Sequence, residues 1–154
     1  MKLTIKQIFF LVFIGCLVLS CKKEDSIPTI EVVNEYTLNG KTYSLSEKVK
    51  WSFDEGYGLN LLKAATGQTT LFLLTLPQDV KKNEKYFVGN EVNIMLAYPN
   101  QPVYTAKNDV KVVITDYYDG KNGFIKGTFS GTFFYVVNAQ TVDVQISGIF
   151  TGEK

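Results

Sequence analysis

The sequence predicts an all-β fold: an antiparallel two-sheet β-sandwich of about nine to eleven strands, with a closed calycin-like β-barrel as the alternative. Apolar residues recur mostly at every second position, and Val, Ile, Thr, Tyr and Phe are enriched in these runs. Turn-forming residues separate the runs, and no stretch has a convincing helical period. A barrel would pair the first strand with the last around a cavity, whereas a sandwich would have two sheets and a filled core.

The first half of the domain is expected to consist of hairpins. Its predicted strands span residues 32–38, 41–46, 49–53, 59–65 and 70–76. Asn39-Gly40 is typical of the two-residue type I′ turn, which would join the first two strands. Trp51 alternates with polar neighbours, which predicts a core position for its side chain. The fifth strand, after a turn around Gly67, is almost entirely apolar, as expected for a central strand covered on both faces.

The second half is also expected to be all strand and turn. Its predicted strands span residues 86–88, 92–98, 110–118, 125–137 and 142–150. The polar segment 77–85 is the expected place for a short helical turn, and the segment 99–109 is expected to be a loop.

The last two strands alternate most regularly and are expected to form a hairpin. A four-residue loop over 138–141 would place Gly131 opposite Gly148 on the buried face. Facing glycines leave a notch, which an aromatic side chain should fill, with Trp51 the leading candidate.

The N-terminal residues resemble the export signal of a bacterial lipoprotein. Lys2 and Lys6 form a positively charged region ahead of twelve apolar positions, 8–19. Twelve are too few for a transmembrane helix, which needs about 20 residues. The segment 18–21, which ends in Cys21, resembles a lipobox, in which the cysteine thiol takes up diacylglycerol. Cys16 is a rival site, but cleavage there would leave apolar residues on the mature chain.

Three parts are therefore expected: a signal peptide over 1–20, a lipidated tether over 21–29 and a single all-β domain over 30–154. The resemblance implies three acyl chains on Cys21, enough for stable anchoring, whereas one chain binds a bilayer only marginally. The segment 23–25 either resembles a surface-export signal or is a solvated linker. The expected location is the outer membrane, on its periplasmic face or at the cell surface.

Composition excludes several classes of function. All 16 basic residues are lysine, they form no cluster, and 15 acidic residues balance them. Nucleic-acid binding is not expected, since proteins that bind nucleic acids favour arginine, whose planar guanidinium donates two parallel hydrogen bonds. The chain contains no histidine, which excludes Ser-His-Asp and Cys-His catalysis and histidine-ligated zinc.

Two weaker kinds of site are left. Asp116 and Asp119 are the nearest carboxylate pair for a glycoside hydrolase, but the segment 119–123 is a turn sequence in its own right. The segment 116–122 also offers oxygen ligands for Ca²⁺, although it lacks EF-hand spacing and Lys121 would repel the ion. We expect no catalytic residue, metal or cofactor.

Aromatic side chains suggest a ligand surface. They make up 14% of the chain and include nine tyrosines, and exposed rings can stack on sugar faces. Tyr43, Tyr86 and Tyr135 lie in strand patterns typical of core residues. The tyrosines near turns that could form a ligand surface are Tyr57, Tyr98, Tyr104, Tyr117 and Tyr118. A binding patch would require several of them to converge on one end of the fold.

Three segments, 39–43, 111–117 and 123–130, resemble a family of small Bacteroidetes lipoprotein domains of unknown function. Its motifs are an Ile-Thr strand, a turn and an Ile-x-Gly-Thr-Phe-Ser strand, found here from Ile125. The resemblance implies an all-β envelope lipoprotein and carries no catalytic residue. We therefore expect a noncatalytic lipid-anchored protein that binds a ligand or partner. Its partners would be membrane lipid through Cys21 and a glycan or envelope protein; a small apolar-ligand carrier and a weak carboxylate hydrolase are the alternatives.

Overall fold

The computed structural model describes residues 34–154 except 46 and 68. The chain forms two units, Met1–Ile30 and Glu31–Lys154, and the description here concerns the second. The predicted signal peptide, the tether and Cys21 lie outside the described residues. Within the described part, no helix is long or apolar enough to cross a membrane.

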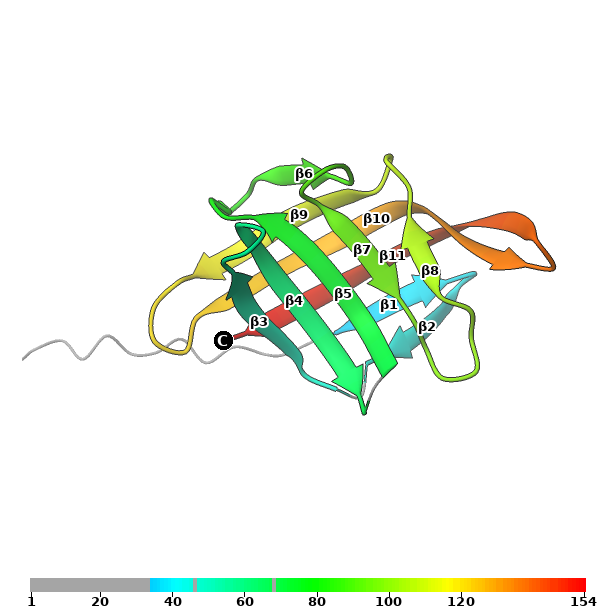
Figure 1. Ribbon diagram of the computed structural model, residues 1–154, viewed down its shortest axis with the longest axis horizontal. Coiled ribbons are helices and arrows are strands. Elements are labelled where there is room, and N and C mark those ends of the chain that lie inside the picture. Colours follow the sequence, from blue (N-terminus) through cyan, green and yellow to red (C-terminus); the bar gives the residue numbers. More distant parts are fainter. Residues whose placement is uncertain (1–33, 46, 68) are drawn as a thin grey trace, which may run out of the picture. The chain divides into compact units, whose positions relative to one another are not determined.

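The described residues form strands and turns and no helix, so the prediction of an all-β fold is confirmed. The strands, drawn in Figure 1, are β1 (Glu35–Leu38), β2 (Lys41–Ser44), β3 (Val49–Asp54), β4 (Leu59–Thr66), β5 (Thr69–Pro77), β6 (Lys85–Phe87), β7 (Asn93–Leu96), β8 (Tyr104–Ala106), β9 (Lys111–Tyr118), β10 (Phe124–Val137) and β11 (Gln140–Glu153). The expected helical turn within 77–85 is absent: this segment ends β5 and continues as turns.

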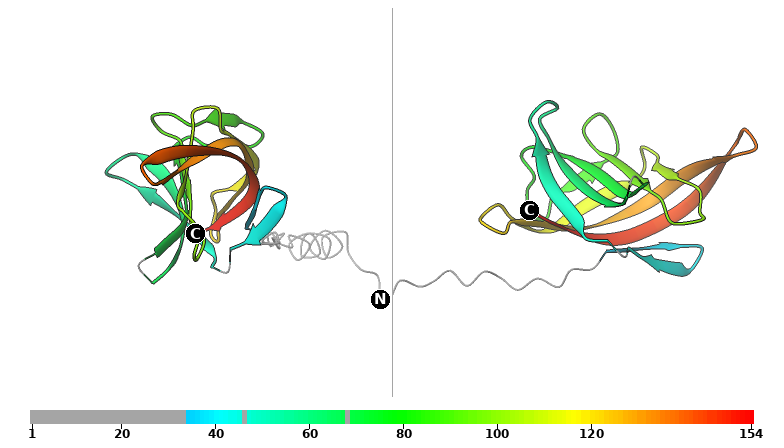
Figure 2. Two further views of the ribbon diagram at one scale, coloured as in Figure 1. Left: turned by 90° about the vertical axis from the view of Figure 1, so that its right-hand side faces the viewer. Right: turned by 60° about the horizontal axis from the view of Figure 1, so that its bottom comes forward.

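Hydrogen bonds join all eleven strands into one sheet, in the order β2-β1-β11-β3-β4-β5-β7-β8-β10-β9-β6. Because β10 also pairs with β11, the strands from β11 to β10 in this order close into a ring of seven. The left view of Figure 2 shows this ring nearly end-on. The two-sheet detail of the prediction is not confirmed, and ring closure and the β1–β11 pairing are features expected of the barrel alternative.

β10 and β11 pair along their whole length, and each of them also pairs with two further strands. β11 carries β1 in its middle and, in the one parallel pairing of the sheet among the described residues, β3 at its end. β10 carries β9 on its first half and β8 on its second. Beyond β8, the β10–β11 hairpin projects from the ring (Figure 2).

The predicted four-residue loop over 138–141 is wrong. Val137 pairs with Gln140, and Asn138 and Ala139 form a two-residue turn with φ of 49° and 60°. Positive φ at both central residues is typical of a type I′ turn, whose twist matches that of the flanking strands. The shorter turn shifts the register by two residues, so Gly131 faces Ile146 and not Gly148.

Two glycines of this hairpin have phenylalanine rings packed against them, where the sequence suggests the ring of Trp51. Gly148 faces Phe129, and a Cβ on Gly148 would lie 2.4 Å from Cζ of that ring. Gly127 likewise faces Phe150, at 2.6 Å. The expectation that Trp51 fills the notch is therefore wrong, because rings from the hairpin itself fill it.

The interior of the ring is filled by apolar side chains, and four phenylalanines pack against one another there. Phe72 packs against Phe129 and Phe150 with ring centroids 6.3 and 6.0 Å apart, and Phe133 packs against Phe129 at 6.0 Å. Each of the four is at most 2% exposed, and burial of such a side chain contributes about 1.5–3 kcal/mol. Trp51 is buried as predicted, and its Nε1 donates to Asn60 Oδ1 at 2.9 Å.

Candidate functional site

Five tyrosines lie close together at one end of the ring, and we call them the tyrosine cluster. They are Tyr36 on β1, Tyr43 on β2, Tyr98 after β7, Tyr104 on β8 and Tyr135 on β10. Tyr36 stacks on Tyr43, with centroids 5.3 Å apart and an interplanar angle of 17°. Tyr43 meets Tyr98 edge-on at 5.1 Å, and Tyr104 meets Tyr135 edge-on at 5.5 Å. Tyr104 also lies close enough to Tyr36 to raise the pKa of its hydroxyl, so the two groups of rings are neighbours.

The cluster has an inner and an outer layer. Tyr36 and Tyr104 are 1% and 3% exposed, whereas Tyr43, Tyr98 and Tyr135 are half-buried and pack against the core. Lys41 Nζ lies 5.1 Å from the centroid of the Tyr43 ring, at the rim of the cluster. The outer rings thus combine an apolar face with a polar edge, as in many ligand sites.

The hydroxyl of Tyr36 is the unusual group of this cluster. It is buried, and none of the described residues forms a hydrogen bond with it. Burial, and then the neighbouring Tyr104, Tyr43 and Tyr98, raise the pKa of Tyr36 above its ordinary value, so the hydroxyl stays protonated. A buried hydroxyl without a partner costs about 1–3 kcal/mol, and such groups call for an explanation.

The five tyrosines predicted as a ligand surface do not form one patch. Tyr98 and Tyr104 belong to the cluster, but Tyr117 and Tyr118 pair with the opposite end of β10. There Tyr117 packs on Trp51 at 5.7 Å and Tyr118 on Phe124 at 6.1 Å. Tyr57 lies alone on the β3–β4 turn, 82% exposed. Tyr104 is not exposed, because the alternation of β8 turns its side chain inward.

The strand patterns predict core positions for Tyr43 and Tyr135, and no strand pattern in the sequence singles out Tyr36. One pattern could have found the first pair: the Asn39-Gly40 turn fixes a hairpin in which Tyr36 directly faces Tyr43. No sequence pattern joins this pair to Tyr135, because β1 and β10 are connected only through β11.

The two carboxylates named above as candidate catalytic groups form ion pairs with lysines. Asp116 accepts from Lys82 Nζ at 2.8 Å, and chiefly this hydrogen bond lowers the pKa of Asp116. A general acid needs the opposite shift. Asp119 forms an ion pair with Lys154. Among the described residues, no group of three or more His, Cys, Asp or Glu side chains is placed to hold a metal ion.

Comparison with protein-family models, curated proteins and solved structures finds no match for this chain. The resemblance of the segments 39–43, 111–117 and 123–130 to a lipoprotein family therefore stays a prediction. The function proposed below rests on the chemistry of the side chains described above.

Proposed function

We propose that this chain is a noncatalytic, lipid-anchored protein of the bacterial cell envelope that binds a ligand at its tyrosine cluster. The observation that carries the proposal is the unpaired, buried hydroxyl of Tyr36 with Tyr43, Tyr98 and Tyr104 close to it. Ring contacts join Tyr36, Tyr43 and Tyr98 in one group and Tyr104 and Tyr135 in another. The apolar segment 8–19 and the lipobox-like residues before Cys21 support the anchor.

The ligand class that suits the cluster best is a glycan. Sugar rings have apolar faces that stack on aromatic rings and hydroxyls that exchange hydrogen bonds with phenolic groups. The half-buried rings of Tyr43, Tyr98 and Tyr135 supply such faces. The open end of a closed sheet is also a common place for ligand binding.

The test is a glycan array probed with the mature chain in detergent, followed by calorimetric titration of the glycans that bind. Tyr43→Ala and Tyr98→Ala should each weaken binding roughly tenfold, as expected for the loss of about 1.4 kcal/mol of aromatic contact. Tyr57→Ala, which removes the most exposed tyrosine outside the cluster, should leave the affinity unchanged. If the array shows no binding, or if all three variants bind alike, glycan binding by the cluster is rejected.

A second candidate, a carrier of small apolar ligands, is favoured by the closure of the seven-strand ring. Phe72, Phe129 and Phe133 fill the interior, however, and a carried molecule would have to displace them. A fluorescent fatty acid discriminates the two functions, since a carrier binds it and a glycan-binding protein does not.

A further inference from the structure

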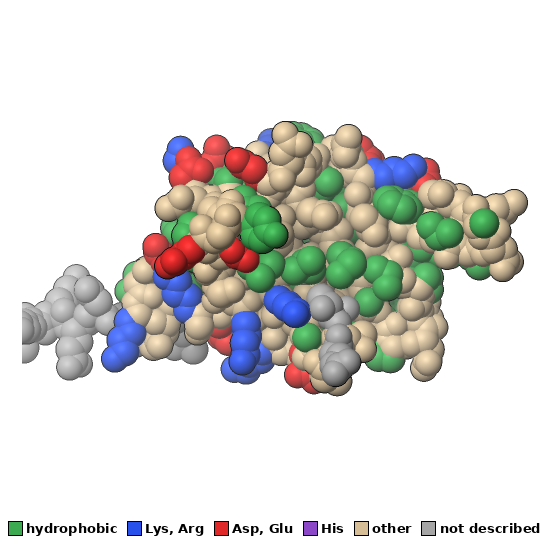
Figure 3. All heavy atoms as spheres, viewed as in Figure 1, with side chains coloured by type: hydrophobic (Ala, Val, Ile, Leu, Met, Phe, Trp, Pro, Cys, Tyr) green, Lys and Arg blue, Asp and Glu red, His purple; other side chains and the backbone are tan. Residues whose placement is uncertain are grey.

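A groove of about 710 Å³ lies on the outer face of β3 and β4, beside the end of β11. We call it the lysine groove. Its lining residues are Glu47, Lys48, Lys50, Trp51, Ser52, Leu61, Lys63, Ala65 and Lys154. Figure 3 shows lysines over this part of the face, below a row of apolar side chains. The groove therefore has an apolar floor and a rim of mostly positive charge.

Two of these lysines are not balanced by acids. Lys50 directly faces Lys63 across the β3–β4 pair, and both are exposed. Like charges at directly opposed positions destabilise a strand pair, since their Cβ atoms lie only about 5 Å apart. In the described part of the chain neither lysine forms an ion pair. An anion in the groove would remove the repulsion between them.

The neighbouring charges are partly neutralised. Lys48 pairs with Glu153 at 3.5 Å, and Lys154 pairs with Asp119. Glu47, the acidic side chain of the lining, accepts a hydrogen bond from Thr66 Oγ1 at 3.2 Å and, among the residues that the structure describes, forms no ion pair with Lys50 or Lys63. The uncompensated positive charge is therefore concentrated at the facing pair of Lys50 and Lys63.

The polypeptide enters the domain beside this groove. Asn34 is buried, and its Oδ1 accepts from the backbone nitrogen of Thr151 at 2.7 Å. The next two residues of β11 pair with Val49 and Lys50 of β3. Asn34 follows Cys21 by thirteen residues, which span at most about 45 Å when extended. A lipid on Cys21 would hold Asn34 within that distance of the bilayer, and the groove lies beside the strand end that Asn34 contacts.

We propose that the lysine groove docks on the phosphate headgroups of the membrane that carries the protein. This inference rests on the lipid anchor of the proposed function. A few lysines attract a soluble protein to an anionic bilayer only weakly, but a short tether raises the effective concentration of the surface to the millimolar range. The anchor then provides attachment, and Lys50 and Lys63 set the orientation, with the β3–β4 face on the lipid.

The chain contains a built-in reporter for this contact. Its single tryptophan, Trp51, lines the groove, and Lys154 Nζ lies 4.4 Å from its ring centroid. The lipidated full chain is reconstituted into phosphatidylcholine vesicles with or without one part in about three of phosphatidylglycerol. Energy transfer from Trp51 to a dansyl-labelled headgroup should be at least twofold greater in the anionic vesicles. Half-molar salt should abolish the difference, because the Debye length falls to about 4 Å.

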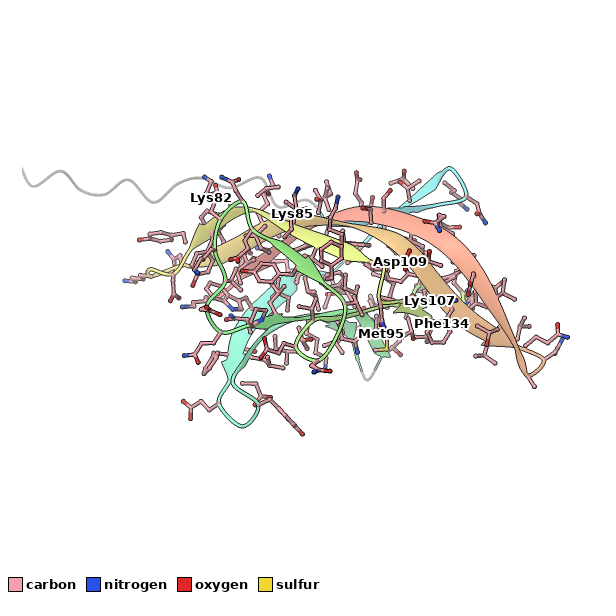
Figure 4. The ribbon with its side chains drawn as sticks, turned by 90° about the horizontal axis from the view of Figure 1, so that it is seen from above. Lys82, Lys85, Met95, Lys107, Asp109 and Phe134 are labelled. Carbon is pink, nitrogen blue, oxygen red and sulfur yellow. The ribbon has the colours of Figure 1, made fainter. Side chains whose placement is uncertain are left out.

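Substitutions distinguish docking by the lysine groove from a general attraction between the positive charge of the protein and the anionic vesicles. Lys50→Gln together with Lys63→Gln should abolish the extra transfer. The matched control removes the same charge with Lys81→Gln and Lys85→Gln, in exposed residues near or on β6; Figure 4 shows Lys85 and the neighbouring Lys82 there. This control should keep the extra transfer.

Flotation of the vesicles in half-molar salt tests the anchor separately. If the chain floats but the transfer is equal in neutral and anionic vesicles, or equal in the two double variants, the docking is overturned and the anchor stands. If the chain does not float, the anchor of the proposed function is wrong, and the docking is overturned with it.

Discussion

At the scale of single residues, Tyr36 combines a favourable and an unfavourable group. Its ring is 1% exposed and stacks on Tyr43, while its hydroxyl has no partner among the described residues. Tyr36→Phe keeps the ring and removes the hydroxyl. We expect this variant to be more stable than the parent chain by roughly 1 kcal/mol in urea unfolding, because a desolvated hydroxyl is lost and no hydrogen bond is broken.

Tyr86 offers the matched control for that substitution. Its hydroxyl donates to Glu84 Oε2 at 2.8 Å and accepts from the backbone nitrogen of Lys81 at 3.0 Å. Tyr86→Phe should therefore lower stability by about 1 kcal/mol. A loss of stability in both variants would mean that Tyr36 is hydrogen-bonded in the folded protein, against the structure.

Ala139 has the backbone conformation least suited to its residue type. Its φ is 60° at the second position of the β10–β11 turn, a region in which a residue with a Cβ costs about 1 kcal/mol relative to glycine. Ala139→Gly should raise the unfolding midpoint, with a gain of roughly 0.5–1 kcal/mol. A decrease would indicate that Ala139 does not have a positive φ and that the turn differs from the one described here.

At the scale of elements, the β10–β11 pairing depends on glycines that face phenylalanines. A Cβ on Gly148 would lie 2.4 Å from Phe129 Cζ and 2.5 Å from the carbonyl oxygen of Glu35, and backbone cannot move aside as a flexible side chain can. Gly148→Val should therefore destabilise the fold by roughly 1–3 kcal/mol in thermal or urea unfolding.

The neighbouring Ser147 provides a control within the same strand. Its side chain is exposed, so Ser147→Val adds the same side chain to β11 without overpacking and should change stability by less than about 0.5 kcal/mol. Equal effects of the two substitutions would show that the paired register of Gly148 with Phe129 is incorrect.

Period-two alternation predicts most of these strands because each has one face in the core and one in solvent. It misses β8, because these three residues lie within the segment 99–109, where Pro99 and Pro102 favour a loop. The Asn39-Gly40 turn is predictable from its residues, whereas Asn138-Ala139 lacks the glycine that usually marks a type I′ turn. That single difference explains why the first hairpin register is predicted correctly and the last is not.

At the scale of the whole molecule, closure of the ring depends on contacts that no local pattern encodes. β3 meets β11 through only two residue pairs, and β8 meets β10 through two. Without these, the strands would form an open sheet. The tyrosine cluster and the lysine groove both depend on this long-range arrangement. Sequence patterns can therefore identify the strands that carry these residues, but they cannot predict that the residues lie close together. Only the facing of Lys50 and Lys63 follows from one hairpin, once its register is known.

Burial of tyrosines throughout the molecule makes the fold sensitive to alkaline pH. Burial is the main cause that raises the pKa of Tyr36, Tyr104 and Tyr117, and it raises the pKa of Tyr86 to about 12, from an ordinary value of 10.0. In an unfolded chain these hydroxyls would ionise at the lower value. The stability that they contribute is thus complete below about pH 10 and is lost as the pH rises through the raised values.

The free energy of unfolding should therefore fall steeply between about pH 10 and pH 12, in parallel with the tyrosinate absorbance of the unfolding chain. Lysines lose their charge over the same range, so the comparison with Tyr36→Phe isolates the phenolic contribution. That variant has one buried phenol fewer and should lose less stability over the range than the parent chain. Identical slopes for the two proteins would show that Tyr36 ionises as readily in the folded as in the unfolded chain, which its burial at 1% exposure does not allow.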